Sequence, residues 1–482
     1  MDKSPEINPS FSRRKFIKNS SLVAGGFMIV PRHVLGRGFR APSDKLNIAG
    51  IGAGGKAEVN LPYAWNNGAE NIVTLCDVDD RQSVNARKRW PDAPYYKDYR
   101  VLLEKEAKNI DAVIVTTPDH MHAPIALAAM QLGKHVYCEK PLTHDIYEAR
   151  TLTQAAAKYK VVTQMGNQGS SGDDTRVVET WIQAGVIGPV TKVHVWTNRP
   201  VWPQGIPAPT GKFDIPKELD WELWLGTAPF REYNPGYLPA IWRGWSDFGT
   251  GSLGDMGCHF IDVPYRSLKL GYPVSVECSV GSVYSGFFHE EIYTDSYPPS
   301  SVTTLQFPAR GNMPPVKLIW YDGGIKPQRP DELLPDEPMG EWDGGIIFEG
   351  SKGKLMAGLF GRKATLLPTK LMKTTTLPKS KFPFVDRGSE GHQTQWVNAC
   401  KKGFGAYTSS SFDKSGPLTE TVLMGNLAVR SYNYNETNAK GEKNYPGRKK
   451  LLWDGANMKI TNFEPANQFV RRNYRGSYKL EL

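Results

Sequence analysis

The chain has 482 residues, of which 40% are hydrophobic and 22% are charged. This length leaves room for two or three domains with a sizeable core, and the composition argues against disordered, coiled-coil, collagen-like and polytopic membrane proteins. The 59 Lys and Arg against 49 Asp and Glu give a formal net charge of +10, but residues 1–43 hold six of those ten charges. The surplus on the rest of the chain is about four, which is too small to indicate a nucleic-acid partner.

The N-terminal segment resembles a twin-arginine export signal. Arg13 and Arg14 precede an apolar pair and a lysine at 16–18, and a weakly apolar run follows at 20–30. A run this short cannot span a bilayer core, which takes about 20 residues, so no stable membrane span is expected. These features predict a signal and linker over 1–43, recognition by the twin-arginine export machinery, and a periplasmic or otherwise exported protein.

The next segment has the pattern of a dinucleotide-binding unit. A short apolar run at 45–51 ends in a glycine-rich turn, and a helix is predicted over 56–66. The turn has G-x-G-x-x-G spacing, in which a side chain would hold the backbone away from a pyrophosphate at the helix N-terminus. The predicted cofactor-binding residues of this turn are Gly50, Gly52, Ala53, Gly54 and Gly55.

An acidic residue follows the second predicted strand, at 71–76. This residue, Asp77, is placed to accept hydrogen bonds from the adenine-ribose hydroxyls of a dinucleotide. A carboxylate at this position repels a 2′-phosphate. The sequence therefore predicts NAD in preference to NADP.

Predicted strands and helices continue to alternate after Asp77. The further strands are at 112–117, 135–138 and 161–165, and the helices are at 123–132 and 146–159. This alternation predicts a parallel, doubly wound sheet, whose ligands bind beyond the carboxyl ends of the strands. We therefore expect an α/β fold with a Rossmann dinucleotide-binding domain over 44–168 and an α+β domain for substrate binding and oligomerisation over 169–482.

Four motifs together resemble the Gfo/Idh/MocA family of sugar and cyclitol oxidoreductases. They are the glycine turn, Thr117-Pro118 followed by His122, Glu139-Lys140-Pro141, and the run from Asp255 to His259. The resemblance implies that Lys140 lies beside the nicotinamide and the reacting carbinol. The other cofactor contacts that it implies are Asp119, which stands where the family commonly has Asn, His122, Glu139 and Asn167.

Asp255 and His259 lie four residues apart on a predicted helix with Ser252 as its N-cap, so both side chains face the same way. An imidazole with a carboxylate one turn away suits a general base with an orienting partner. Oxidation of an alcohol needs such a base, because the hydroxyl proton must leave as hydride transfers. We predict His259 as the base, Asp255 as its orienting partner or as a ligand of a neighbouring hydroxyl, and Lys140 as part of the hydrogen-bond relay; the family resemblance agrees.

The start of the second domain supplies the candidate substrate contacts. A strand is predicted at 191–198, and an aromatic, proline-rich stretch follows at 199–237. Exposed aromatic side chains there would stack on sugar rings, although each Trp is equally well explained as pinning a loop into the core. The aromatic candidates are Trp202, Trp221, Trp224 and Tyr233, and the polar candidates are Arg199, Arg243 and His392. His392 precedes a predicted helix at 394–400 and could be returned to the site by it; alternatively, the segment is only the start of a capped surface helix.

Six β-branched or aromatic runs between 274 and 367 predict an open antiparallel sheet, because Gly, Pro and charged turns separate them. Related proteins use such a sheet face for dimer or tetramer contacts, so the resemblance implies a homo-oligomer. The tail from Lys440 is predicted to be loop-like.

No metal site is predicted. The five cysteines are widely spaced and form no zinc-type cluster, so buried free thiols are expected. His120 and His122 have H-x-H spacing, but no third ligand is adjacent.

If an NAD-binding enzyme is exported, its cofactor must stay bound, because free NAD is not expected outside the cytoplasm in useful amounts. One mechanism that meets this need oxidises a sugar, glycoside or cyclitol hydroxyl and then reduces a second carbonyl. The other oxidises a ring carbon transiently, cleaves a glycosidic bond by elimination, and reduces the product again. We predict the oxidoreductase, because the Asp255 and His259 pair matches the dehydrogenase branch of the family, and we keep a non-catalytic sugar-binding protein as a third reading.

Overall fold

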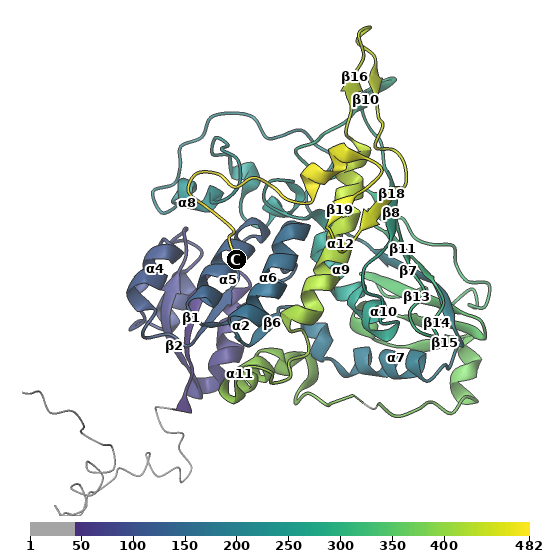
Figure 1. The fold of residues 1–482 in the computed structure, drawn as a ribbon, viewed down its shortest axis with the longest axis horizontal. Helices are drawn as coiled ribbons and strands as arrows, with labels where there is room; N and C mark the ends of the chain where they lie inside the picture. Colours follow the sequence, from purple (N-terminus) through teal and green to yellow (C-terminus); the bar gives the residue numbers. More distant parts are fainter. Residues whose placement is uncertain (1–43, 381) are drawn as a thin grey trace, which may run out of the picture. The chain divides into compact units, whose positions relative to one another are not determined.

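The computed structural model describes residues 44–380 and 382–482, which contain two large β-sheets joined by helices (Figure 1). The predicted twin-arginine segment over 1–43 lies outside the described residues. Within the described part of the chain, no helix is long and apolar enough to cross a membrane.

The first sheet is parallel and has six strands. In sheet order they are β3 (Tyr95–Tyr96), β2 (Asn71–Cys76), β1 (Asn47–Ile51), β4 (Ala112–Val115), β5 (His135–Cys138) and β6 (Thr163–Met165). The chain order reverses between β1 and β4, and this reversal opens a crevice at the carboxyl ends of the two strands. The predicted doubly wound sheet is confirmed.

Helices cover both faces of this sheet, because its central strands are apolar on both sides. Ala112 and Ile114 of β4 join one hydrophobic core, and Val113 and Val115 join the other. The helices on the first face are α2 (Ala57–Trp65), α3 (Val84–Arg89) and α11 (His392–Lys402), and those on the second are α4 (Tyr99–Glu106), α5 (His122–Gln131) and α6 (Ile146–Lys158). The helix predicted at 394–400 is therefore part of the cover of the first domain.

The second sheet has nine strands. In sheet order they are β15 (Thr365–Leu367), β14 (Gly353–Ala357), β13 (Gly344–Gly350), β7 (Val190–Thr197), β12 (Val316–Tyr321), β11 (Ser301–Phe307), β8 (Ser275–Val280), β18 (Leu451–Asp454) and β19 (Lys459–Ile460). Its strand pairs are antiparallel except β7 and β12, which run parallel. Burial alternates along β11, so one face of the sheet packs on the core. All six predicted runs form strands of this sheet.

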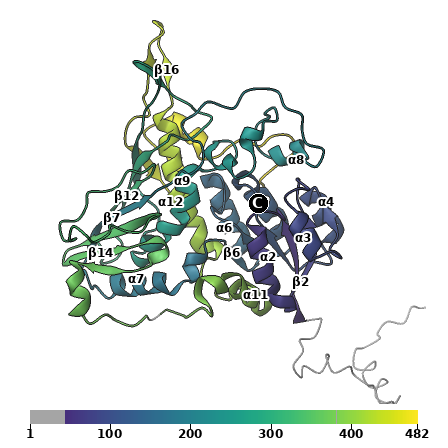
Figure 2. The ribbon, with the colours of Figure 1, turned by 180° about the vertical axis from the view of Figure 1, so that it is seen from behind.

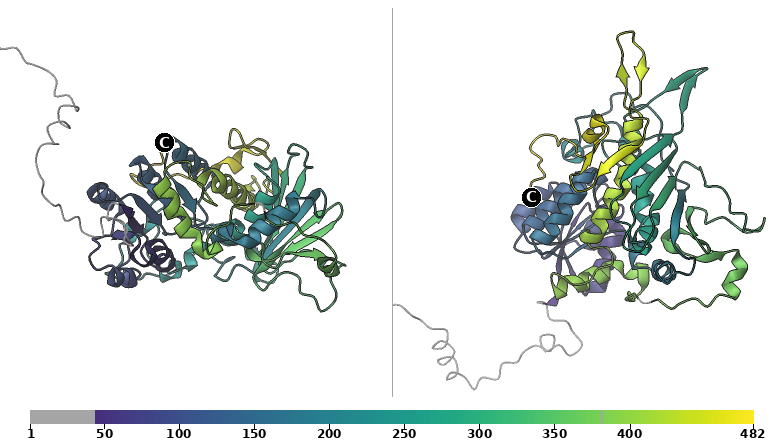
Figure 3. Two further views of the ribbon diagram at one scale, coloured as in Figure 1. Left: turned by 90° about the horizontal axis from the view of Figure 1, so that it is seen from below. Right: turned by 45° about the vertical axis from the view of Figure 1, so that its right-hand side comes forward.

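A long helix that the sequence did not predict joins the two sheets. This helix, α12 (Phe412–Tyr432), contacts α6 on one side and α9 (Gly251–Phe260) and β8 on the other (Figures 2 and 3). Most of its residues are buried. A helix buried on all sides lacks the polar stripe from which amphipathic helices are read, and this explains why the pattern was missed.

The N-terminus of α9 differs from its prediction. The helix begins at Gly251, with Thr250 at the N-cap position, so Ser252 lies inside the first turn and is not the cap. The hydroxyl of Thr250 does not cap the helix; it donates to the Asp119 carboxylate at 2.6 Å. The sequence beyond α9 continues as α10 (Asp262–Ser267) after a short break.

The C-terminal tail is more ordered than predicted. After a short hairpin of β16 (Glu436–Thr437) and β17 (Lys443–Asn444), it supplies β18 and β19 and then returns to the first domain. There the buried Arg472 lies 2.7 Å from Glu148 and 3.7 Å from Asp145, at the N-terminus of α6. The prediction of a loop from Lys440 onward was therefore wrong at β17, β18, β19 and the 3₁₀ turn Glu464–Phe469, where strand pairing and local hydrogen bonds order the chain.

Candidate functional site

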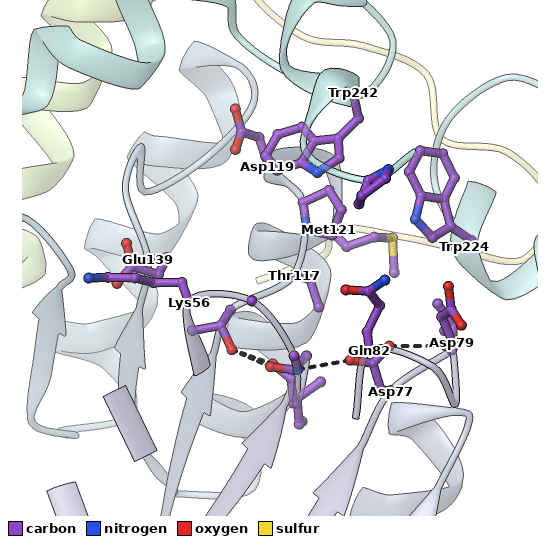
Figure 4. Close-up of a pocket in the computed structure, with 18 of the residues that line it drawn as sticks. Lys56, Asp77, Asp79, Gln82, Thr117, Asp119, Met121, Glu139, Trp224 and Trp242 are labelled. Atoms are coloured by element: carbon purple, nitrogen blue, oxygen red, sulfur yellow. Dashed lines mark hydrogen bonds between the residues drawn. The ribbon is translucent and has the colours of Figure 1, made fainter. Parts of the chain in front are cut away.

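A pocket of about 810 Å³ lies at the carboxyl ends of the parallel strands (Figure 4). Residues from both domains and from the C-terminal tail line it. Those predicted from the sequence are Gly52, Gly54, Gly55, Asp77, Asp119, His122, Glu139, Lys140, Trp224, Tyr233, Arg243 and His259.

The glycine turn forms one wall, and backbone contacts explain its composition. A Cβ on Gly52, whose φ is +82°, would lie 2.7 Å from the Thr116 carbonyl carbon, and one on Gly54 would lie 2.6 Å from the Gln82 carbonyl oxygen. Neither position has room for a side chain. Gly55 also has a positive φ, +54°, and open space beside it.

Gly50 and Ala53 support this wall from behind. A Cβ on Gly50 would lie 2.9 Å from a methyl group of Leu61 in α2, so this glycine allows the helix to approach the strand closely. Ala53 is fully buried in the core under α2.

Asp77 lies at the end of β2 beside the turn. Its carboxylate accepts hydrogen bonds from the backbone N–H of Gly54 at 3.2 Å and of Asp79 at 3.0 Å. Burial raises the pKa of Asp77 to about 6, against the lowering effect of these hydrogen bonds. A partly buried carboxylate that lines the pocket here suits the recognition of ribose hydroxyls.

At the other end of the pocket, Lys140 pairs with Asp255. The Lys140 Nζ lies 2.6 Å from the Asp255 Oδ1 and also donates to the Asp255 carbonyl oxygen at 2.8 Å. The Arg243 Nε lies 3.3 Å from the same Oδ1. Burial alone would raise the pKa of Asp255, but Lys140 and Arg243 outweigh it and lower this pKa to about 2.

His259 lies one helical turn from Asp255 and lines the pocket. Burial and the positive charge of Lys140 lower its pKa to about 3, against the opposing effect of Asp255. Its Nδ1 is buried without a hydrogen-bond partner among the described residues. The carboxylate of Asp255 instead pairs with Lys140 and Arg243, so the role of Asp255 in orienting the imidazole or binding a neighbouring hydroxyl stays a prediction.

Three further predicted residues hold the loops around the pocket. Both ring nitrogens of His122 lie 2.8 Å from backbone carbonyl oxygens, of Thr117 and of Pro141, and so clasp the loops after β4 and β5. Glu139 accepts a hydrogen bond from Asn60 in α2 at 2.8 Å. Burial raises the pKa of Asp119, whose partner is the Thr250 hydroxyl.

Besides Gly50, Ala53, Asp255 and Trp221, four predicted residues lie outside the lining of this pocket. Asn167 is buried and donates to the Ser170 hydroxyl, and Trp202 donates from its indole to Gln204. Arg199 donates to Asn198, and its guanidinium lies 5.6 Å from the ring of Trp342. His392 is completely buried, with ring nitrogens 2.6 Å from the Ser171 hydroxyl and 2.8 Å from the Met165 carbonyl oxygen. The prediction that His392 contacts substrate is therefore corrected: its ring joins α11 to the end of β6.

The aromatic residues predicted to be exposed form a buried cluster. Trp221 and Trp224 of α8 (Trp221–Leu225) stack with ring centroids 4.8 Å apart, and Tyr233 meets Trp221 edge to face. All three side chains are buried. Trp224 and Tyr233 nevertheless line the pocket, and Figure 4 shows Trp224 on the opposite side of it from Lys56. We name this covering segment, residues 219–245, the cap.

Sequence reasoning missed several residues of the lining. Lys56 follows the glycine turn directly, and its place there was a usable signal. Trp242, in the cap, and Tyr478, in the tail, also line the pocket. No local pattern points to them, because tertiary packing brings them to the site.

The parallel sheet, the glycine turn and Asp77 define a dinucleotide-binding protein whose second domain closes the pocket. Residues 46–167 match the Gfo/Idh/MocA model described as oxidoreductase family, NAD-binding Rossmann fold, and residues 179–282 match the C-terminal alpha/beta domain of that family. Two segments of this chain, together just under half of it, are thus similar to the two domains of Gfo/Idh/MocA oxidoreductases.

Two curated relatives illustrate its range. Levoglucosan dehydrogenase of Pseudarthrobacter phenanthrenivorans is 25% identical over 232 residues, which cover 45% of this chain and 50% of the relative. A glycosyl hydrolase family 109 protein of Shewanella is 26% identical over 201 residues, which cover 36% of this chain and 43% of the relative. The chain thus spans half or less of the length of these relatives.

A solved structure shares the fold over more of the chain. The WlbA dehydrogenase from Bordetella pertussis, in complex with NADH and UDP-GlcNAcA, superposes with a TM-score of 0.53 at 16% identity. The match covers 79% of this chain and 95% of that one.

Proposed function

We propose that this protein is an NAD-dependent oxidoreductase that removes hydride from a hydroxyl-bearing carbon of a sugar, glycoside or cyclitol. The observation that carries the proposal is the placement of His259 and Lys140 in the same pocket as the glycine turn and Asp77, with Lys140 held by Asp255. The dehydrogenase named among the relatives acts on a carbohydrate, which supports this substrate class.

The residues of the turn fit a dinucleotide. Gly52 and Gly54 carry no side chain, so the backbone of the turn could approach a pyrophosphate closely, and Asp77 would accept hydrogen bonds from the ribose hydroxyls. The carboxylate favours NAD over NADP, because a 2′-phosphate would meet negative charge. NAD supplies the hydride acceptor when bound.

The residues at the other end of the pocket would remove the proton of the substrate hydroxyl. The lowered pKa of His259 keeps its imidazole neutral near pH 7, the form that can accept the hydroxyl proton. Because the same shift makes it a weak base by itself, proton removal would also depend on stabilisation of the substrate oxygen. Lys140 donates a hydrogen bond to the same substrate oxygen and stabilises its developing negative charge. Asp255 holds Lys140 in place at 2.6 Å.

We further propose that the cofactor stays bound through the catalytic cycle and that the protein is exported by the twin-arginine route. Arg13 and Arg14 support export, and the cap and Tyr478 support retention, because they line the same pocket as the turn. A retained cofactor is restored by reduction of a second carbonyl compound. A homo-oligomer remains part of this proposal on the family resemblance alone.

The match to a glycosyl hydrolase family 109 protein favours a second candidate function. In that case, transient oxidation at a ring carbon makes the neighbouring C–H acidic, elimination cleaves the glycosidic bond, and re-reduction restores the cofactor. A third candidate, a non-catalytic sugar-binding protein, is opposed by the paired Lys140 and Asp255 and by the neutral His259 in the pocket.

Mass spectrometry of protein purified without added cofactor tests retention, and we expect bound NAD or NADH. Glycosides are then screened for keto-sugar products and for release of the aglycone, which separates the two enzymatic functions. His259→Ala should retain NAD and lose turnover. Activity equal to that of the parent in His259→Ala would contradict the proposed oxidoreductase mechanism. Stoichiometric release of NADH with loss of cofactor on gel filtration would contradict cofactor retention.

A further inference from the structure

The structure raises the question of what holds the imidazole of His259 in place. Its Nδ1 has no hydrogen-bond partner among the described residues, and the carboxylate one turn away is engaged by Lys140 and Arg243. A catalytic imidazole ordinarily gains its orientation from such a bond. Here the orientation must come from packing.

Phe360 supplies that packing. Its ring meets the His259 ring edge to face, with centroids 5.1 Å apart and an interplanar angle of 78°. Phe360 belongs to the short 3₁₀ turn Leu359–Gly361 between β14 and β15, which contacts α9. Edge-to-face aromatic pairs favour a defined geometry and contribute about 0.5–1.5 kcal/mol beyond the burial of their area.

The backbone of Phe360 lies in the left-handed region, with φ +61° and ψ 17°. A bulky residue rarely adopts this conformation, which costs of order 1–3 kcal/mol and persists only where the surroundings enforce it. Strain of this kind gathers at functional sites, and here it directs an aromatic ring at His259. The hydroxyl of Thr175 anchors the strained residue by donating to its carbonyl oxygen at 2.8 Å.

Gly169 and Arg362 fix the ring from other sides. A Cβ on Gly169 would lie 2.2 Å from the Phe360 Cδ1, so only glycine at 169 admits the ring in this position. The Arg362 guanidinium lies 5.9 Å from the Phe360 centroid and is itself held 3.0 Å from Glu341. The ring is therefore set by contacts from several separate segments.

We propose that Phe360 is the positioning residue of His259, setting the orientation of its imidazole and excluding water from one side of it. The proposal rests on the proposed function, in which His259 is the base. Phe360 itself touches neither cofactor nor reacting atoms in this scheme. Its effect is on kcat, because a tilted imidazole meets the substrate hydroxyl at the wrong angle.

Charged groups around His259 also act on its titration and must be held constant. They are Lys140 and Lys56, from the first domain, Asp255, from α9, and Arg199, from the end of β7. None of them is altered by the variants below. A change in titration in those variants therefore reports the loss of the ring.

Three variants of the full chain separate positioning from folding. Phe360→Gly removes the ring and relieves the left-handed backbone, Phe360→Tyr keeps the ring, and Gly169→Ala leaves residue 360 intact but displaces its ring. We expect kcat to fall about 10- to 100-fold in Phe360→Gly and Gly169→Ala, with KM and NAD affinity within about threefold, and Phe360→Tyr to restore kcat to within about threefold of the parent.

A second readout requires no substrate. Histidine-labelled protein is titrated by NMR, with the signal of His259 assigned from His259→Gln. Water that enters the space left by the ring stabilises the charged imidazolium, so the pKa should rise from about 3 in Phe360→Gly and stay low in Phe360→Tyr. An unchanged titration together with an unchanged kcat in Phe360→Gly would overturn the proposal. A shifted titration in a protein that oxidises no sugar would instead overturn the proposed function and leave the placement of the imidazole by Phe360 standing.

Discussion

Lys140 Nζ lies 2.6 Å from Asp255 Oδ1 and thereby joins the loop after β5 to helix α9, across 115 residues of sequence. Both side chains are largely buried, with exposed fractions of 14% and 12%. The pair brings a cation from the dinucleotide-binding domain to the helix that carries His259. It is thus both a structural tie between the domains and part of the proposed catalytic site.

Replacement of Lys140 should affect stability and turnover together. Lys140→Met leaves the Asp255 carboxylate with Arg243 alone, and removing one partner of a buried pair costs about 3–5 kcal/mol. We expect turnover to fall at least about 100-fold, because the hydrogen-bond relay to the substrate oxygen is lost. Calorimetry and steady-state kinetics measure the two effects.

The Lys192–Glu349 pair provides a matched control. It is more exposed, at 42% and 29%, and lies on the nine-stranded sheet. Lys192→Met should change the free energy of unfolding by less than about 1 kcal/mol. Equal losses in the free energy of unfolding in the two Met variants would contradict the prediction that the more buried Lys140–Asp255 pair contributes more to stability.

Buried histidines should make the protein sensitive to mild acid. Burial lowers the pKa of His259 and of His120 to about 3, and that of His392 to about 4. Unfolded histidines bind protons below about pH 6.5, while these rings stay neutral in the folded state, so the unfolded state gains protons and the free energy of unfolding falls as the pH drops from about 6.5 towards 4.

Urea unfolding between pH 8 and pH 4 measures this dependence. His392→Gln removes one of the titrating groups and lies outside the pocket. Its unfolding free energy should vary less steeply, by about 1.4 kcal/mol per pH unit between pH 6 and 4.5. A slope identical to that of the parent would show that His392 does not contribute.

Asp77 should make cofactor binding depend on pH. Burial raises the pKa of Asp77 to about 6, so below this value the carboxyl binds a proton and accepts hydrogen bonds from the ribose hydroxyls less well. We expect NAD affinity to fall as the pH drops from 7 to 5. Isothermal titration of cofactor-free protein measures the change.

Asp77→Asn is the companion variant. It should bind NAD more weakly and show a smaller pH dependence from this position, and it should accept NADP better because the repulsion of a 2′-phosphate is removed. If this variant prefers NAD over NADP as strongly as the parent does, residues other than Asp77 determine the cofactor preference.

The tail should control how fast the cofactor leaves. Arg472 is buried, pairs with Glu148 at 2.7 Å, and donates to the His120 carbonyl oxygen at 2.6 Å, while Tyr478 lines the pocket a few residues later. Arg472→Met leaves a buried carboxylate unpaired and should loosen the tail. We expect NADH to dissociate about 10-fold faster, measured by fluorescence during chase with excess NAD.

Lys479 serves as the control for this variant. Its pair with Glu481 is exposed, so Lys479→Met should leave the dissociation rate within about twofold of the parent. Rates that are unchanged in Arg472→Met would exclude a role of the tail in retention.

Local sequence patterns determined the elements that depend on neighbouring residues. The strand and helix alternation predicted the parallel sheet, and the glycine spacing predicted a turn in which Gly52 and Gly54 have no room for a side chain. Asp255 and His259 were expected on one helix, and both lie on α9. Such predictions succeed because helical and strand periodicity, and the freedom of glycine, are properties of short stretches of chain.

The tertiary structure alone decided which groups meet. It paired the Asp255 carboxylate with Lys140, placed Phe360 against the His259 ring, and buried His392 away from the pocket. It also brought Tyr478, near the C-terminus, into the same pocket as the glycine turn, which lies near the start of the described chain. Ion pairs and ring contacts between distant segments are set by how the helices and sheets pack, and one sequence taken alone carries no periodic signal for that packing.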